Sequence, residues 1–182
     1  MKIMIKTILF CAISFLVITW FSQPQDEQSP MVFSQDTEIV TPTRITQSSP
    51  PCLQMFYNIE KFAKKYDIPR NYAFGIAYAE TRYDGPFQWK YNHTQESFAG
   101  AIGPMQIMHS TANMMWPGKT ISRKQLMQDI AFNVETSMKL LRRLHDKYND
   151  WRIVFGAYNT GRPCINGYAN MVYNYNPNFQ NN

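Results

Sequence analysis

The stretch SRKQLMQDIAFNVETSMKLLRRLHDKY, residues 122–148, decides the fold class of this protein. Its apolar side chains recur at spacings of three or four residues, at Leu126, Ile130, Val134, Met138, Leu141, Leu144 and Tyr148. This spacing places them on one face of an α-helix. Ser122 followed by Gln125 is a capping-box pattern, so we predict one long helix that begins after Ser122 and ends near Tyr148.

Shorter helical patterns lie on both sides of this stretch. The spacing of apolar residues predicts helices over residues 53–66, 70–80, 104–115, 151–158 and 167–173. Pro104 stands at the first position of the third of these, a position that tolerates proline. Residues 84–103 contain glycine and proline among polar residues, which indicates a loop. Because no useful segment alternates with a period of two, the predicted fold class is mainly α.

The N-terminal region has a different composition. Residues 7–21 form an uncharged apolar run behind Lys2 and Lys6, the pattern of an export signal to the periplasm or cell envelope. Its length suits a cleaved signal peptide or a retained inner-membrane anchor. Residues 23–51 hold five of the eleven prolines and no glycine, which predicts a flexible linker. We therefore expect four regions: signal or anchor 1–22, linker 23–51, ordered domain 52–173 and disordered tail 174–182.

Composition excludes several classes of function. The 182 residues are 45% hydrophobic, as in a globular domain, and the net charge of +5 falls to +3 without Lys2 and Lys6. That charge is too weak to indicate nucleic-acid binding. We predict no metal and no cofactor, because the chain lacks a phosphate-binding Gly-rich loop and its three histidines have no ligand spacing. These are His93, His109 and His145.

Two cysteines lie outside the apolar run, Cys52 and Cys164. In an oxidising compartment they could form a disulfide. The alternative is two buried free thiols, because a sequence does not show whether the two Cα atoms approach each other. Both readings stay open at this point.

Glu80 is the strongest candidate for a reactive group. It shares one stripe of its predicted helix with Ala73, Ile76 and Ala77, so its carboxyl is expected on the core side. Burial and the negative end of the helix dipole both raise the pKa of such a carboxyl. A carboxyl that is protonated near neutral pH suits a general acid acting on a leaving oxygen. Periodicity alone also allows a glutamate that reaches solvent at a helix end.

Three further segments follow Glu80-Thr81-Arg82-Tyr83 in order: SFAGAIGPMQIM at 97–108, AYNTG at 157–161 and GYANMV at 167–172. Together the four segments resemble the motifs of the soluble lytic transglycosylase family, which cleaves peptidoglycan. The resemblance covers about residues 53–173. It implies a lysozyme-like helical domain with a groove.

The resemblance also implies roles for single residues. Glu80 matches an acid that protonates the glycosidic oxygen between N-acetylmuramic acid and N-acetylglucosamine. The same carboxylate then takes the proton of the C6 hydroxyl, which attacks C1 and leaves a 1,6-anhydro end. Ser97 and Tyr168 match residues that contact this carboxyl. Four residues match the sugar-binding groove: Met105, Gln106, Tyr158 and Asn159. Without the resemblance, Met105 and Tyr158 would be interpreted as core residues.

The sequence departs from the family pattern at three places. The segment 84–96 is longer than usual and contains Trp89 and Tyr91, so it is either a carbohydrate-stacking surface or a packed loop. Pro104 replaces the usual leucine, and Ser137 replaces a frequent glycine. Local helix entry and packing are therefore expected to differ.

Two alternatives to a transglycosylase remain. A hydrolytic muramidase would need a second carboxylate, and the candidates are Asp84, Glu96 and Asp129. None of them has the sequence context of a nucleophile. The other alternative is a non-catalytic, peptidoglycan-binding envelope component. The expected partners are peptidoglycan glycan strands, the membrane at the N-terminal segment, and an envelope-spanning secretion, conjugation or pilus machine or a phage particle.

Overall fold

The computed structural model describes residues 46–179. The predicted signal or anchor 1–22, the linker up to residue 45 and residues 180–182 of the tail lie outside the described residues. The elements are α1 (Pro51–Lys65), α2 (Arg70–Thr81), β1 (Ala101–Ile102), β2 (Ile107–Met108), α3 (His109–Met115), α4 (Arg123–Gln128), α5 (Ile130–Tyr148), α6 (Trp151–Thr160) and α7 (Gly167–Tyr173). The predicted mainly α fold class is confirmed. In this part of the chain, every helix is too short or too polar to cross a membrane.

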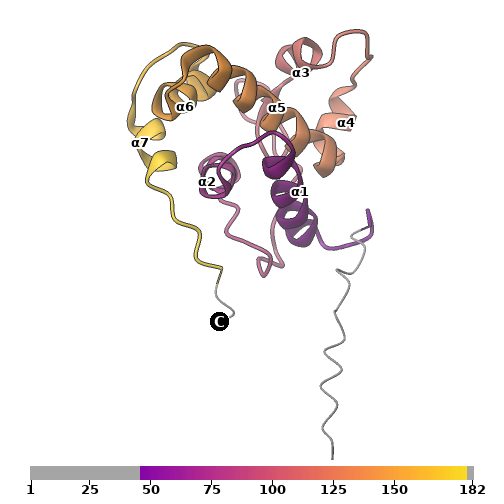
Figure 1. Ribbon diagram of the computed structural model, residues 1–182. Coiled ribbons are helices and arrows are strands. Elements are labelled where there is room, and N and C mark those ends of the chain that lie inside the picture. Colours follow the sequence, from indigo (N-terminus) through magenta and orange to yellow (C-terminus); the bar gives the residue numbers. More distant parts are fainter. Residues whose placement is uncertain (1–45, 180–182) are drawn as a thin grey trace, which may run out of the picture. The chain divides into compact units, whose positions relative to one another are not determined.

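Helix α5 is the centre of the domain (Figure 1). Helices α1 and α6 both pack against it, and α7 packs against α6 and α2. The core between these helices contains fully buried side chains from α1, α2, α5 and α6, among them Met55, Phe74, Met138 and Phe155. The arrangement brings the C-terminal helix beside the second one, although many residues separate them in sequence.

The prediction of one continuous helix over 122–148 is wrong, because the chain leaves the helical conformation at one residue. Asp129 has φ −90° and ψ 91°, which ends α4 and starts α5. Its carboxylate accepts a hydrogen bond from the Phe132 amide at 2.9 Å and so caps α5. The capping of α4 by Ser122, whose Oγ accepts from the Gln125 amide at 3.0 Å, is confirmed. Periodicity missed the break because the apolar spacing continues through it.

The predicted helix over 104–115 begins later, at His109 in α3. The residues before it form a tight turn between β1 and β2, which pair antiparallel. Gly103 and Gln106 both have positive φ, 77° and 50°, which a helix does not allow. A Cβ on Gly103 would lie 2.5 Å from the side-chain nitrogen of Asn133, so only glycine fits. Pro104 therefore lies in a turn and does not begin a helix.

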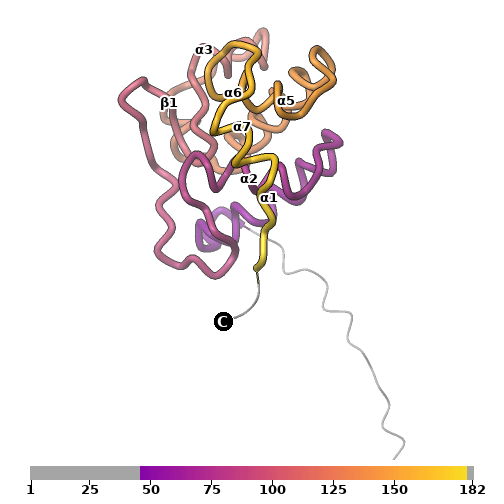
Figure 2. The backbone as a smooth tube through the Cα atoms, turned by 90° about the vertical axis from the view of Figure 1, so that its left-hand side faces the viewer, coloured from indigo at the N-terminus to yellow at the C-terminus, as the bar shows by residue number. Residues whose placement is uncertain are grey.

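The tail over 174–182, expected to be disordered, is ordered as far as residue 179. Figure 2 shows this segment, in yellow, running past α2 and α1. Tyr175 stacks on Tyr78 of α2, with ring centroids 5.1 Å apart. Phe179 packs edge-on against Phe74, with centroids 4.7 Å apart. Contacts with distant helices order the segment, and a search for helical periodicity does not detect them.

The two cysteines expected to pair or remain free are both free. Cys52 is fully buried in α1. Cys164 follows α6, and its backbone carbonyl lies against Gly156 so closely that a Cβ there would come within 1.8 Å of it. This packing holds Cys164 on α6. The structure therefore has no disulfide between them, and of the two free thiols only Cys52 is buried, because Cys164 is partly exposed.

Candidate active site

Glu80 lies in the last turn of α2, which ends at Thr81. Arg82 adopts the left-handed conformation, φ 58°, and terminates the helix. The Thr81 hydroxyl donates to the Pro104 carbonyl at 2.9 Å and lies 2.8 Å from the Tyr91 hydroxyl. These buried bonds fasten the end of α2 to the β1–β2 turn and to the 84–96 segment. The position of the Glu80 backbone is thus defined from two sides.

The Glu80 carboxyl is partly buried and is held by a residue from the other end of the domain. Tyr168 of α7 donates a hydrogen bond from its hydroxyl to Glu80 Oε1 at 2.5 Å. Burial raises the pKa of Glu80 to about 7, and the Tyr168 hydrogen bond opposes this rise. Protonated and ionised forms therefore coexist near neutral pH. Such a group can donate a proton and later accept one.

Tyr158 of α6 lies near this carboxyl. Burial, and then the charge of Glu80, raise the pKa of Tyr158 well above its usual value. Its hydroxyl donates to the Met105 carbonyl at 2.8 Å and lies 2.9 Å from Ser137 Oγ. Because a phenol has one proton, Ser137 donates to Tyr158. Ser137 therefore holds the tyrosine in place.

Burial also raises the pKa of Tyr168 well above its usual range, and the negative charge of Glu80 adds to the effect. Both tyrosines thus remain neutral hydrogen-bond donors at all pH values near neutrality. Asn166 caps α7 by accepting from the Ala169 amide at 2.8 Å, which fixes the helix that carries Tyr168. The family resemblance implied that Tyr168 contacts the Glu80 carboxyl, and the structure contains this hydrogen bond.

The structure separates the other predicted site residues. The Met105 side chain is fully buried, and its amide donates to Asn133 Oδ1 at 2.9 Å, so in this structure it packs in the core and does not reach the surface. The Gln106 side-chain nitrogen Nε2 donates to the Gly103 carbonyl at 2.9 Å and closes the turn. Asn159 is exposed near the end of α6, with its oxygen 3.4 Å from the Asn166 nitrogen.

Ser97 is also placed differently from the expected contact with the carboxyl. Its hydroxyl accepts from the Ala101 amide at 3.0 Å, and its own amide donates to the Ala101 carbonyl at 2.9 Å. Within residues 46–179 it has no hydrogen bond to Glu80. Ser97 therefore shapes the short loop that enters β1.

The sequence reasoning missed Asn133, and it named Ser137 only as a departure from the family pattern, without a partner. Asn133 is fully buried, and its side-chain nitrogen donates to the carbonyls of Ile102 and Leu126, both at 2.9 Å. It therefore joins α4, α5 and the β1–β2 turn. A signal was present: both polar residues lie on the apolar face of α5, four positions apart. A buried polar side chain in such a stripe indicates a bond to backbone from another element.

The candidate second carboxylates lie in other environments. Asp84 is exposed, Glu96 forms an ion pair with Arg123, and Asp129 caps α5. None of the three has a hydrogen bond to Glu80 or Tyr168 in the described part of the chain. Among residues 46–179 there is also no cluster of three His, Cys, Asp or Glu that could hold a metal ion.

The 84–96 segment has a buried part and an exposed part. Tyr91 is buried, and its ring packs edge-on against Tyr83 at 5.0 Å. Phe87 and Trp89 instead expose 49% and 61% of their surface and form a T-shaped pair at 6.4 Å. The segment is thus a packed loop at its root with an exposed aromatic pair at its tip.

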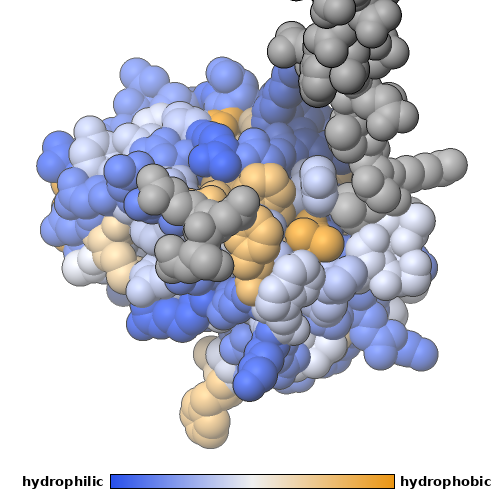
Figure 3. Space-filling view, turned by 90° about the horizontal axis from the view of Figure 1, so that it is seen from below, coloured by the Kyte–Doolittle hydropathy of each residue, from blue (hydrophilic) through white to orange (hydrophobic). Residues whose placement is uncertain are grey.

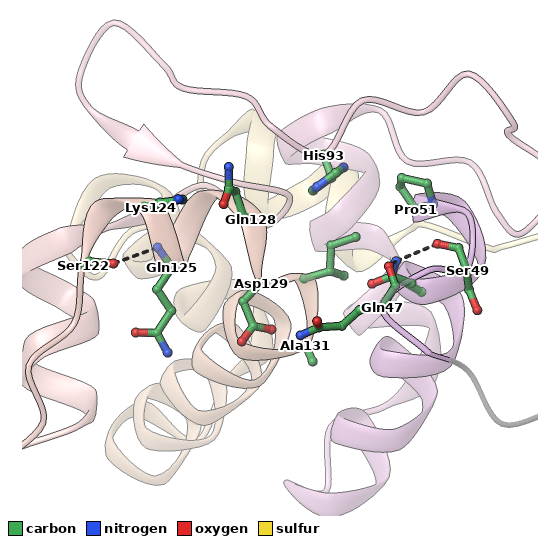
Figure 4. Close-up of a pocket in the computed structure, with 12 residues that line it drawn as sticks. Gln47, Ser49, Pro51, His93, Ser122, Lys124, Gln125, Gln128, Asp129 and Ala131 are labelled. Carbon is green, nitrogen blue, oxygen red and sulfur yellow. Dashed lines mark hydrogen bonds between the residues drawn. The ribbon is translucent and has the colours of Figure 1, made fainter.

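A polar pocket of about 650 Å³ is lined by neither Glu80 nor Tyr168 (Figure 4). It opens between the start of α1, the junction of α4 with α5, and His93. Its walls carry Lys124, Gln128 and Asp129, but none of the predicted site residues. This pocket therefore does not contain the carboxyl whose pKa is raised. The raised pKa makes Glu80, and not the pocket, the candidate reactive site.

Solved structures of known proteins have a similar fold. The fold is similar to the 70-kDa soluble lytic transglycosylase Slt70 from Escherichia coli, with a TM-score of 0.50 and 26% identity over 64% of this chain and 18% of that chain. It is also similar to a 70-kDa soluble lytic transglycosylase in complex with bulgecin A, with a TM-score of 0.49 and 25% identity over 64% of this chain and 18% of that chain. An inactive mutant of lytic transglycosylase Slt from Pseudomonas aeruginosa has a TM-score of 0.47 and 24% identity over 58% of this chain and 16% of that chain.

The match thus spans less than a fifth of these longer proteins. A comparison with curated protein sequences gave no significant match. The family described as transglycosylase SLT domain matches residues 57–180, from α1 through the C-terminal segment. Since this match covers more than half of the sequence, the chain belongs to the transglycosylase SLT domain family.

Proposed function

We propose that this protein is a peptidoglycan lytic transglycosylase that cleaves the β-1,4 bond between N-acetylmuramic acid and N-acetylglucosamine. One observation carries the proposal: Glu80 is a partly buried carboxyl with a pKa near 7, hydrogen-bonded to Tyr168, in a chain of the SLT family. The similar solved structures are lytic transglycosylases by their own descriptions. The absence of a second carboxylate beside Glu80 in the described residues favours this reaction over hydrolysis.

The reaction uses one carboxyl twice. Protonated Glu80 gives its proton to the glycosidic oxygen, the bond from C1 to that oxygen breaks, and N-acetylglucosamine leaves with a 4-hydroxyl. The Glu80 carboxylate then takes the proton of the C6 hydroxyl while that oxygen bonds to C1. The product is a 1,6-anhydro-muramoyl end, Glu80 is protonated again, and no water is consumed. A carboxyl with a pKa near the working pH suits both steps.

The neighbouring residues support this chemistry. Tyr168 orients the Glu80 carboxyl and stabilises its ionised form by donating a hydrogen bond. Tyr158 remains neutral and holds α6 against the β1–β2 turn through the Met105 carbonyl. Gln106 is partly exposed and Asn159 is exposed, so both can contact the sugars. Met105 acts from the core, by supporting Tyr158.

The products of purified peptidoglycan test this proposal. The intact protein should release muropeptides that are one water lighter than hydrolysis products, measured by mass spectrometry. A Glu80→Gln protein should bind peptidoglycan but release none. Glu96→Gln is the matched control, because Glu96 is exposed and pairs only with a surface arginine. Reducing ends would indicate a hydrolytic muramidase, and binding without any product in the parent would indicate a non-catalytic envelope component.

The cellular setting is part of the proposal. The apolar run over 7–21 supports export, with the N-terminal segment in contact with the membrane and the domain in the periplasm or cell envelope. The proline-rich residues 23–51 give the domain reach toward the glycan strands. A small catalytic domain behind such a linker is suited to act together with an envelope-spanning machine. Fractionation of producing cells should find the protein with the envelope; a cytosolic protein would contradict this part.

A further inference from the structure

The segment after α7 alternates between two environments. It is extended, and successive side chains face the domain or the solvent in turn. The partly buried residues are Tyr175, Pro177 and Phe179, and the exposed ones are Asn174, Asn176 and Asn178. This period of two is that of an extended strand lying on a surface. The apolar half of the segment is thus seated on the domain along its whole described length.

Tyr175 packs against α2, and we call the surface that each aromatic residue of the segment contacts its seat. Its ring stacks on Tyr78 with centroids 5.1 Å apart. A Cβ on Gly75 would come within 3.1 Å of both Tyr175 Cβ and the Val172 carbonyl. Because Gly75 has no side chain, the end of α7 and Tyr175 approach α2 closely.

Phe179 has a second seat, formed by α1, α2 and the start of the 84–96 segment. Its ring packs edge-on against Phe74 at 4.7 Å and Phe56 at 5.7 Å. The Arg70 guanidinium carbon lies 5.5 Å from the ring centroid, within cation–π range. Gly85 has φ 111°, and a Cβ there would come within 2.5 Å of the ring. The phenyl ring therefore occupies the space that any larger residue at position 85 would need.

The same region forms an apolar pocket of about 410 Å³ that Phe179 lines together with Leu53, Tyr57, Pro86 and Phe87. Figure 3 shows apolar side chains gathered among polar ones on the face seen there. Gly75 and Gly85 thus leave the space that two aromatic residues of one short segment occupy, and the apolar pocket lies beside Phe179. Such a match indicates a defined docking geometry rather than loose coverage of the surface.

The segment continues directly from the helix that carries Tyr168. Helix α7 has seven residues, too few to be stable alone, so its position depends on tertiary contacts. It packs on α6 and on α2, and its C-terminal end continues into the segment that carries Tyr175. Glu80 itself lies between the two seats in sequence, after Tyr78 and before Gly85. The segment and the carboxyl therefore share α2 as their support.

We propose that residues 175–179 form a C-terminal strap, in which Tyr175 and Phe179 act as positioning residues that hold α7 against α2 and thereby keep Tyr168 on Glu80. The activity readout of this inference rests on the proposed function. Groups that face Glu80 from packed elements are Tyr168 of α7 and Tyr158 of α6. When the strap is released, Glu80 gains water and loses the Tyr168 bond. Burial is the larger influence, so the pKa of Glu80 falls toward that of an ordinary carboxyl.

Four variants of the full chain test the strap. Truncation after Asn174 leaves α7 and its final cap in place and removes the strap. Phe179→Ala empties one seat, and the conservative Phe179→Leu refills most of it. The matched control combines Asn176→Ser with Asn178→Ser on the solvent side. Each protein is checked for folding by circular dichroism at the assay temperature.

Two measurements follow for each variant. The first is kcat on purified peptidoglycan, where a misplaced reacting group costs about ten-fold or more. The second is the titration of the Glu80 side-chain carboxyl by ¹³C NMR, assigned by comparison with Glu80→Gln. The truncated and Phe179→Ala proteins should lose about ten-fold in kcat and show a lower Glu80 pKa. Phe179→Leu should restore both, and the asparagine control should match the parent.

The strap is overturned if folded proteins without it keep the parental kcat and Glu80 titration, or if the asparagine control shows the same losses. Should the truncated chain fail to fold, the comparison of Phe179→Ala with Phe179→Leu decides. An inactive parent would contradict the proposed function, whereas the NMR titration would still test the strap by itself.

Discussion

At the scale of single residues, the site depends on a balance around Glu80. Burial raises its pKa to about 7, while the Tyr168 hydrogen bond acts in the opposite direction. Sequence periodicity predicted a carboxyl on the core side of its helix, and the structure places it there in partly buried form. The partner that opposes burial lies 88 positions away in the chain, on α7. Two predictions follow from this balance.

Tyr168→Phe should lower kcat/KM about ten- to hundred-fold, because a hydrogen bond to a charged group is worth about 1.5–3 kcal/mol. Since this bond lowers the pKa of Glu80, its loss should raise that pKa and move the Glu80 limb of the pH–rate profile to higher pH. Steady-state rates from pH 5 to 9 measure both effects. Tyr57→Phe, an exposed tyrosine on α1, is the control. A limb that moves to lower pH would contradict the assigned role of the bond.

Glu80 should also make stability depend on pH. Its pKa is about 7 in the folded state and near 4.5 when unfolded, so the folded protein binds more protons between these values. Stability should therefore be full below about pH 4.5 and decrease as pH rises through 7, by at most about 3 kcal/mol. Urea unfolding should show that Glu80→Gln gains stability relative to the parent between pH 5 and pH 8. An equal difference at both pH values would refute the buried-acid interpretation.

At the scale of elements, the unexpected feature is the junction of α4, α5 and the β1–β2 turn. Apolar spacing predicted one helix through it, and the spacing itself is correct. The break at Asp129 and the turn before α3 are organised by Asn133, whose partners are 7, 28 and 31 positions away. A helix pattern is a local property, so it contains no information about these bonds.

Asn133→Ala should lower the free energy of unfolding by about 3 kcal/mol or more. It leaves the Met105 amide and the carbonyls of Ile102 and Leu126 without their buried partner, and each such group costs about 1–3 kcal/mol. Urea unfolding curves measure the loss. Gln128→Ala, an exposed substitution near the same junction, should change stability by about 0.5 kcal/mol at most. Similar curves for both variants would show that Asn133 is not the organising residue.

The exposed pair on the 84–96 segment is the other feature at this scale. Phe87→Ala combined with Trp89→Ala should weaken binding to insoluble peptidoglycan about three- to ten-fold, as expected for lost aromatic stacking. Melting temperature should change little, because Phe87 is about half exposed and Trp89 more than half exposed. Co-sedimentation with peptidoglycan measures binding, with Lys90→Ala as control. Unaltered binding would favour the reading of this segment as a surface loop only.

At the scale of the whole molecule, the described domain is stabilised by packing of α1 and α6 on α5, and of α7 on α6 and α2, without a disulfide between its cysteines. Because Cys52 and Cys164 are free, adding a reductant should leave the urea midpoint of the protein unchanged. A native disulfide closing so long a loop would contribute about 4–5 kcal/mol. A midpoint that falls on reduction would therefore show that the two thiols pair in solution.

The sequence by itself determined the helical class, the approximate bounds of most helices, the candidate acid Glu80 and its resemblance to one enzyme family. These properties are local or linear: apolar periodicity, capping residues and the order of short motifs along the chain. Only the tertiary structure decided the break at Asp129, the free state of both thiols, the contact of Tyr168 with Glu80 and the seats of Tyr175 and Phe179. Each of these depends on groups that approach one another only after the helices have packed, and no local pattern encodes such distances.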